Sequence, residues 1–193
     1  QSPQGYSDIP PGTVIEGVIV SDYTSLNMGE NPQEEWNKVD TRVSYCTAYI
    51  QDEDGISGFR LMYNDIYDNR IPRFTKVRIS LDGCMMNHET DPERFTISGL
   101  APSAVTVVQD NVQPSRTVSL SQLTDNDLFT YVTIPNVEFA TKEGSYTNVN
   151  EYLVQKSALN AFTKPADLEC VDVAGVYLKD GEGEAIFLPV NTS

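Results

Sequence analysis

Short runs of β-branched and aromatic residues alternate with polar positions along most of the chain, and turn residues separate the runs. Almost no segment repeats its apolar residues at the spacing of three and four that marks one face of a helix. This pattern favours strands over helices. It predicts strands near 13–22, 43–52, 56–63, 75–84 and 94–99, and a further strand-like run at 104–108.

The clearest single prediction is a β-hairpin over residues 49–61. Two apolar runs flank the pair Asp54-Gly55 there, and Asp-Gly is among the strongest signals for a tight hairpin turn. Five strands with a break between the third and the fourth match the partly open, five-stranded Greek-key barrel of the OB fold. We therefore expect a first OB-like domain over residues 13–115.

The strand pattern restarts after this domain. Residues 119–128 predict a short linking helix, and 131–139 predict a strand in which Pro135 marks an edge or a bulge, because proline cannot donate to a ladder. Two further apolar runs, at 170–178 and 185–190, flank an acidic turn and predict a second hairpin.

Together these segments predict an all-β protein made of two OB-like units with short helical linkers. The second, smaller OB-like domain spans residues 116–193. Residues 1–12 are rich in proline, glycine and serine, which is typical of an extended or flexible linker. We interpret them as a linker that follows a removed leader.

The charge of the chain argues against several classes of partner. With 28 acidic and 13 basic residues, the formal net charge is −15, which repels nucleic-acid phosphates and anionic membrane surfaces. Single-stranded nucleic-acid binding is therefore only a minor alternative. No apolar run approaches the length of a transmembrane helix.

The three cysteines, Cys46, Cys84 and Cys170, form no CxxC pair, and their odd number leaves at least one thiol unpaired. Cys46 alternates with Ala48 and Ile50 and is expected to be a small buried hydrophobic residue on one strand face. A Cys46–Cys84 disulfide is the alternative, provided that their strands are neighbours.

Several strand and turn motifs together resemble a known family. They are Val14-Ile-Glu-Gly-Val-Ile-Val-Ser-Asp22, Tyr49-Ile-Gln-Asp52 with its Asp-Gly turn, Val77-Arg-Ile-Ser-Leu-Asp-Gly83, and Val118-Ser-Leu-Ser-Gln-Leu123 before Val132 to Phe139. In this order they are similar to a domain-of-unknown-function family of OB-like regions in secreted or surface lipoproteins of Bacteroidetes.

The resemblance covers nearly the whole chain and implies export, with a lipid anchor at the outer membrane or cell surface. It implies no reaction and no active-site residues. The chain departs from a compact version of such a region through the long insertion at residues 23–42.

This insertion is the best candidate for a binding surface, because OB folds use the loop between their first two strands for ligands that include oligosaccharides. Tyr23 and Trp36, the only tryptophan, offer apolar stacking area for a sugar ring. The alternative, and the commoner role of a large aromatic residue, is that Trp36 folds back and anchors the loop. Hydrogen-bonding groups surround Trp36, at Asn27, Asn31, Glu34, Glu35, Asn37 and Asp40.

Tyr45 and Tyr49 are expected on the strand face opposite Cys46 and Ile50, where they form a stacking stripe. With Tyr23, Trp36 and Asn37 they complete the predicted ligand site. The ordinary alternative is cross-strand packing of the tyrosines against Arg60 or Arg78.

Two acidic turns are weak candidates for a Ca²⁺ site, through Asp52 and Asp54 in the first and Asp180 and Glu182 in the second. Carboxylates are the ligands that Ca²⁺ prefers, but neither turn has the spacing of an EF loop. Turn chemistry alone accounts for these residues. No other cofactor is expected.

The inventory of catalytic residues is poor. His88 is the only histidine and is expected in a loop, and no nucleophile elbow, zinc-binding helix or phosphate-binding loop is present. A pair of carboxylates could serve a glycosidase, but we expect no enzyme. We expect an extracytoplasmic module that binds a glycan through the 23–42 loop. The alternative is a structural or assembly module that contacts a surface protein.

Overall fold

The computed structural model describes residues 5–25, 33–35, 38–139 and 175–189. The chain divides into two compact units. The first consists of Gln1–Asn31, Thr41–Val118 and Leu123–Thr133, and the second of Pro32–Asp40, Ser119–Gln122 and Ile134–Ser193. Each unit is described by itself below.

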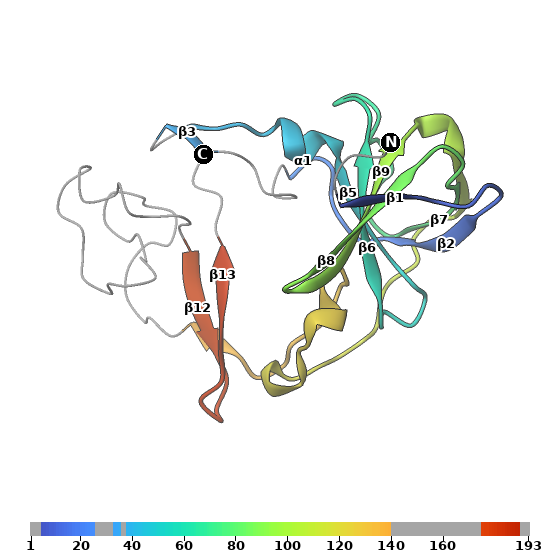
Figure 1. Cartoon of the computed structure of the whole chain (residues 1–193). Coiled ribbons are helices and arrows are strands. Elements are labelled where there is room, and N and C mark those ends of the chain that lie inside the picture. The colour runs from blue at the N-terminus through green and yellow to red at the C-terminus, as the bar shows by residue number, and fades with distance from the viewer. Residues whose placement is uncertain (1–4, 26–32, 36–37, 140–174, 190–193) are drawn as a thin grey trace. The chain divides into compact units, whose positions relative to one another are not determined.

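A mixed sheet of eight strands forms the first unit, in the order β1-β8-β9-β6-β5-β2-β7-β10 (Figure 1). All neighbouring pairs are antiparallel except β6 and β9, which are parallel. The strands are β1 (Tyr6–Asp8), β2 (Val14–Ile19), β5 (Thr47–Gln51), β6 (Gly58–Tyr63), β7 (Thr75–Ser80), β8 (Met85–Thr90), β9 (Glu93–Leu100) and β10 (Val105–Gln109).

The predicted hairpin is formed by β5 and β6. Ile50 pairs with Phe59 across it, and the turn between the strands contains Gly55 at a φ of +68°, a conformation that suits glycine. The Asp52 carboxylate accepts a hydrogen bond from the backbone N–H of Ile56, at 2.8 Å. The Asp-Gly signal in the sequence thus marks a real turn.

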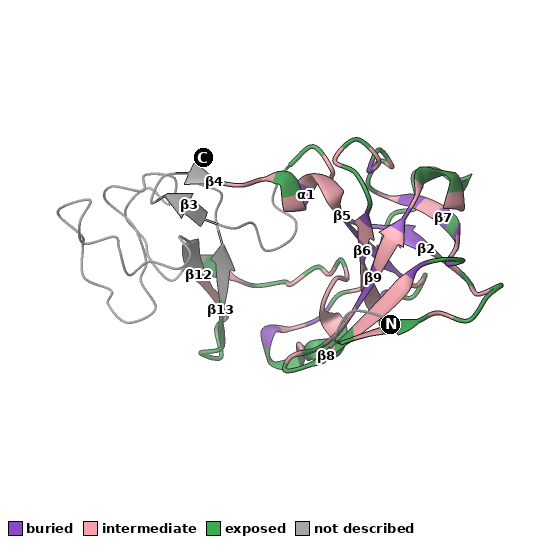
Figure 2. Ribbon diagram, turned by 45° about the horizontal axis from the view of Figure 1, so that its top comes forward, coloured by how far each residue is buried: buried purple, intermediate pink, exposed green. Residues whose placement is uncertain are grey.

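The hydrophobic core lies on one face of the sheet, and Figure 2 colours the buried residues purple. Alternation places the core residues Ala48 and Ile50 on that face of β5, with Tyr49 between them on the opposite face. The other strands contribute to the same core. Its most completely buried members are Ile19, Leu61, Val77, Ile79 and Leu100.

Three local predictions differ from the structure. The expected strand at 43–52 begins only at Thr47, because Arg42–Cys46 form the short helix α1. The loop expected around His88 is β8, which pairs with β9 on one side and β1 on the other. The predicted linker at 1–12 contains β1, whose backbone is ordered by that pairing.

The second unit is described only in part. It holds the predicted hairpin as β12 (Gly175–Lys179) and β13 (Ala185–Pro189), with β11 (Glu138–Phe139) at the edge of the same three-stranded sheet. A second, two-stranded sheet pairs β3 (Gln33–Glu35) with β4 (Lys38–Val39).

The remaining helical segments are single 3₁₀ turns at Pro102–Ala104 (η1), Leu120–Gln122 (η2) and Asp125–Asp127 (η3). The last two replace the linking helix expected at 119–128. The all-β prediction is confirmed, and the structure shows it as one large open mixed sheet. The division into two OB barrels stays a prediction. None of the described helices is long and apolar enough to cross a membrane.

Candidate functional site

The face of the sheet opposite the core, which we call the outer face, carries a row of polar and aromatic side chains. The pairing registers align Tyr49 of β5 with Arg60 of β6, Arg60 with Thr96 of β9, and Thr96 with Asn87 of β8. Tyr49, Arg60 and Asn87 are half-buried. The row joins stacking area to hydrogen-bonding groups across four strands.

An ion pair lies beside this row. Arg94 donates from Nε to Oε2 of Glu89 at 2.7 Å and from Nη2 to Oε1 at 2.9 Å. These hydrogen bonds lower the pKa of Glu89 against the opposing effect of burial, and the charge of Arg60 adds to the lowering. Glu89 therefore stays ionised well below neutral pH, with both oxygens engaged.

A segment that we call the strap, residues 123–133, lies across the outer face at β5 and β6. The Phe129 ring stacks on the Tyr49 ring with their centroids 4.9 Å apart and their planes inclined by 27°. Phe129 has a φ of +63°, which is a strained conformation for a residue with a side chain. A Cβ at Gly58 would lie only 2.7 Å from the Phe129 carbonyl oxygen, so glycine permits this close approach.

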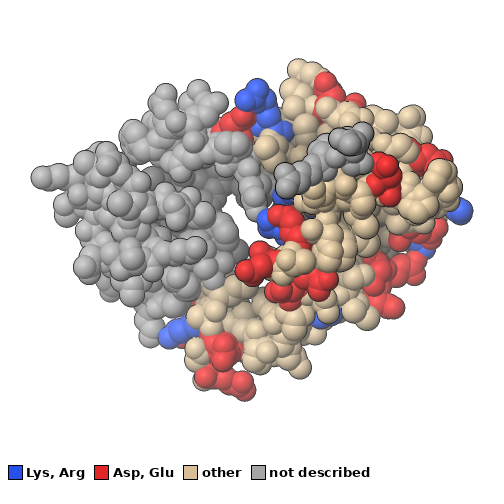
Figure 3. All heavy atoms as spheres, in the orientation of Figure 1, with Lys and Arg blue, Asp and Glu red and all other residues tan. Residues whose placement is uncertain are grey.

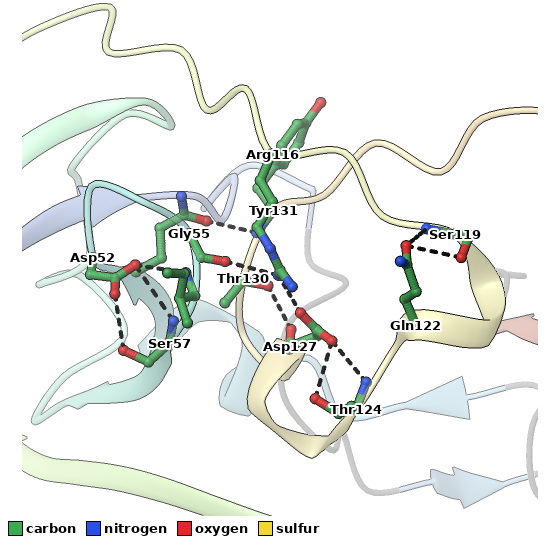
Figure 4. A network of polar contacts seen from close by, with 12 residues as sticks. Asp52, Gly55, Ser57, Arg116, Ser119, Gln122, Thr124, Asp127, Thr130 and Tyr131 are labelled. Atoms are coloured by element: carbon green, nitrogen blue, oxygen red, sulfur yellow. Dashed lines mark hydrogen bonds and ion pairs between the residues drawn. The ribbon is translucent and has the colours of Figure 1, made fainter.

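Arg116 holds the strap to the β5–β6 turn (Figure 4). Its Nη1 donates to the Gly55 carbonyl oxygen at 2.9 Å and forms an ion pair with Asp127. Burial alone would raise the pKa of Asp127, but hydrogen bonds from the Thr124 backbone and from Arg116 outweigh it and lower that pKa. The Tyr131 N–H also donates to Oε1 of Gln51, at 2.7 Å.

A pocket of about 180 Å³ opens between the sheet and the strap. Strands β6 and β9 are parallel neighbours, so their first residues lie side by side at the same end of the two strands, next to the pocket. The pocket is smaller than most drug-sized ligand sites, and an apolar cavity of about 150 Å³ already admits a benzene ring. Its lining residues are Ser57, Gly58, Phe59, Glu93, Arg94, Phe95, Asp125, Asn126, Leu128 and Phe129.

Two phenylalanines of the pocket lining lie, by alternation, on the core side of the sheet: Phe59 pairs with Ile50 and packs against the core, and Phe95 is two residues before Ile97. Phe59 and Phe95 meet edge to face with their centroids 5.9 Å apart. His88 stacks on Phe95 at 4.4 Å, and its Nε2 lies 3.1 Å from Oε1 of Glu93. The residues that line the pocket thus include aromatic residues together with charged and amide groups, a combination that small-ligand sites use.

The structure describes three of the five residues predicted to bind a ligand. Tyr49 lies on the outer face as expected, but Phe129 covers its ring. Tyr45 lies in α1 instead of on a strand. Tyr23 has the Arg70 guanidinium 5.9 Å from its ring centroid. Trp36 and Asn37 lie outside the described residues.

The predicted Ca²⁺ ligands serve as turn residues. Asp180 accepts hydrogen bonds at Oδ1 from the backbone N–H groups of Glu182 and Glu184, at 2.9 and 3.0 Å. Asp52 does the same for its own turn, and Asp54 is exposed in that turn. Within the described residues, no group of three or more histidine, cysteine, aspartate or glutamate side chains is placed to hold a metal ion.

The two cysteines that the structure describes are both free, so the alternative Cys46–Cys84 bridge is not formed. Cys84 is buried in the core, and Cys46 is half-buried in α1. Burial raises the pKa of both thiols. Their thiolate forms are therefore disfavoured at neutral pH, and Cys84 has the role of a small core residue.

Sequence reasoning missed Phe95, Asn126 and Phe129 in the pocket. The signal for Phe95 was its place at the start of a strand that the sequence did predict. No signal marked Phe129, because its contact with Tyr49 joins residues eighty positions apart. Acidic side chains are frequent on the visible face of the first unit (Figure 3), in keeping with the net charge of −15.

Comparisons of the chain with protein-family models, with curated proteins and with solved structures find no match. The resemblance to OB-like regions of Bacteroidetes lipoproteins therefore stays a prediction.

Proposed function

We propose that this protein is a non-enzymatic binding module that takes one sugar ring in the pocket between the sheet and the strap. The observation that carries the proposal is the pocket itself, with Phe59, Phe95 and Phe129 in its wall and Asn126 at its rim. A sugar ring presents an apolar face that stacks on aromatic side chains and hydroxyls that need polar partners. The pocket volume of about 180 Å³ suits a single ring.

The strand order supports an OB-like arrangement of the first unit. Strand β2 pairs with both β5 and β7, and β6 pairs in parallel with β9, as the first, third and fifth strands of an OB fold do. The outer face of β5 and β6 then corresponds to the face on which OB folds bind ligands. We retain the 23–42 loop as a separate candidate contact for a glycan, and export to the cell surface as its setting.

We expect a glycan screen of the whole chain to find binding that Phe95→Ala weakens at least tenfold. The substitution removes the ring of a pocket-lining residue, and a tenfold loss corresponds to about 1.4 kcal/mol, within the range of aromatic stacking. Binding is measured on an array and then by calorimetry. Tyr67→Ala is the matched control, because Tyr67 is 70% exposed and lies outside the pocket lining.

Trp36→Ala belongs in the same screen, because it separates the loop from the pocket. Binding that depends on Trp36 alone would move the site to the 23–42 loop. Binding that Phe95→Ala and Asn126→Ala leave intact would contradict the pocket as the sugar site. No binding to any glycan would count against the sugar as ligand and in favour of the following alternative.

The alternative is a structural or assembly module, and the edge strand β10 favours it. β10 ends the eight-stranded sheet, and its Val107 and Val108 are 49% and 50% exposed. An exposed apolar edge strand is a template for pairing with another chain. We expect the chain to capture a surface protein without added ligand. The Val107→Lys variant should lose this capture. Capture that survives this change would contradict docking at β10.

A further inference from the structure

Arg60 is held in position on the outer face with most of its donors free for another group. Its Nε donates to Oγ1 of Thr96 at 3.1 Å. The side chain is half-buried between its cross-strand neighbours Tyr49 and Thr96. Within the part of the chain that the structure describes, its terminal nitrogens make no ion pair. The hydrogen bond through Nε leaves the N–H donors of the two terminal nitrogens for another acceptor.

Among the described cations of the first unit, Lys76 pairs with Glu16, Arg94 with Glu89 and Arg116 with Asp127. Arg60 belongs to the described arginines for which no carboxylate partner is found. Glu89 is near enough for the charge of Arg60 to influence it, but both of its oxygens accept hydrogen bonds from Arg94. The chain has 28 acidic residues and a net charge of −15. None of the acidic residues that the structure describes forms an ion pair with Arg60.

Arg60 also lies close to the proposed sugar pocket. It follows Gly58, a pocket-lining residue, by two positions on β6, so both face the same side of the sheet. Two residues along a strand span about 7 Å. Arg60 is not itself among the lining residues, so a substituent would have to extend from a ring in the pocket toward the guanidinium.

We propose that Arg60 is an anion subsite of the pocket and binds the carboxylate of an acidic sugar through its terminal nitrogens. This inference rests on the proposed function and adds the class of ligand. A carboxylate matches the guanidinium fork in a bidentate pair, which is stronger and more directional than a neutral hydrogen bond. The acidic surroundings favour a singly charged carboxylate over a doubly charged phosphate.

The test compares glucuronate with glucose, which share a ring and differ in the carboxylate. Each sugar is titrated into the whole chain while NMR follows the Nε–H of Arg60 and the side-chain amide of Asn126. We expect both sugars to shift the Asn126 signal, and only glucuronate to shift that of Arg60. Glucuronate should bind about tenfold more tightly than glucose, and added salt should remove much of that preference.

Arg60→Gln should lose the preference for glucuronate while glucose binds as before. Arg78→Gln is the matched control, because Arg78 is exposed on β7, which does not line the pocket. Inorganic phosphate is titrated in parallel, and tighter binding of phosphate than of glucuronate at Arg60 would overturn the assignment to a carboxylate.

The outcomes separate this inference from the proposed function. Glucuronate that leaves the Arg60 signal unmoved, or that binds Arg60→Gln unchanged, overturns the subsite, even if glucose still shifts Asn126 and the pocket stands. Glucuronate that shifts Arg60 while neither sugar shifts Asn126 supports the subsite and contradicts the ring pocket.

Discussion

Replacing Gly17 with alanine is expected to lower the free energy of unfolding of the first unit by about 3 kcal/mol, the upper part of the range for overpacked sites. Gly17 is buried in β2, where the sheet continues into β5. A Cβ there would overlap the carbonyl oxygen of Gln51 and lie 2.9 Å from Cγ1 of Ile50. The obstacle is backbone, which cannot move aside without separating the two strands.

Urea denaturation followed by circular dichroism measures this effect. Gly181→Ala is the control, because a Cβ added at Gly181 would meet no atom within 4 Å and Gly181 has no positive φ. The free energy of unfolding of this variant should differ from that of the parent by less than about 0.5 kcal/mol. A Gly17→Ala protein as stable as the parent would show that β2 and β5 do not approach as closely as described.

Replacing Arg116 with alanine is also expected to have a large effect, lowering the free energy of unfolding by about 3 kcal/mol. The change removes the partner of Asp127, whose side chain is only 7% exposed, and a buried charge left unpaired is strongly destabilising. It also removes the donor to the Gly55 carbonyl oxygen. Arg78→Ala, at an exposed position of β7, should have an effect below about 0.5 kcal/mol.

Hydrogen exchange locates the loss. The Tyr131 N–H, bonded to Oε1 of Gln51, should exchange faster in Arg116→Ala because the strap opens more often. Amides in the centre of β6 should change less. Uniform acceleration of both would mean that Arg116 supports the whole unit and not the strap alone.

The pH dependence gives the same prediction a second readout. The pKa of Asp127 is lower in the folded protein than its ordinary value. The stability that the Asp127 carboxylate contributes is therefore fully present when the pH is above its ordinary pKa. This contribution is lost as the pH falls through the lowered pKa of the folded protein. Without Arg116 the lowering shrinks, so the variant should lose less of its remaining stability between neutral and acidic pH than the parent does.

The sequence predicted those parts of the fold that local chemistry decides. The β5–β6 hairpin follows from apolar alternation around Asp54-Gly55, and the strands of its core are recognisable from their β-branched residues. Strand β8, Met-Met-Asn-His-Glu-Thr, carries no such pattern. It is a strand because β9 and β1 supply hydrogen bonds on both sides, which is tertiary information.

The candidate site was predicted less well for the same reason. Tyr49 was placed correctly on the face opposite Ile50 by alternation alone. The ring that covers it, Phe129, and the arginine that holds the strap, Arg116, lie more than sixty residues away in the chain from the turn and strand that they contact. Only the parallel pairing of β6 with β9 brings Phe59 beside Phe95, and no local signal announces a parallel pair.

The strap supplies one wall of the pocket, through Asn126, Leu128 and Phe129, and the sheet supplies the other. Any molecule that touches both walls binds only while the strap is docked, so ligand occupancy and strap docking are thermodynamically linked. By mass action, a ligand at a hundred times its dissociation constant would add about 2.7 kcal/mol against opening of the strap. Reciprocally, a change that makes docking of the strap less stable would weaken ligand binding by the same factor. Arg116 would therefore influence ligand affinity without touching the ligand.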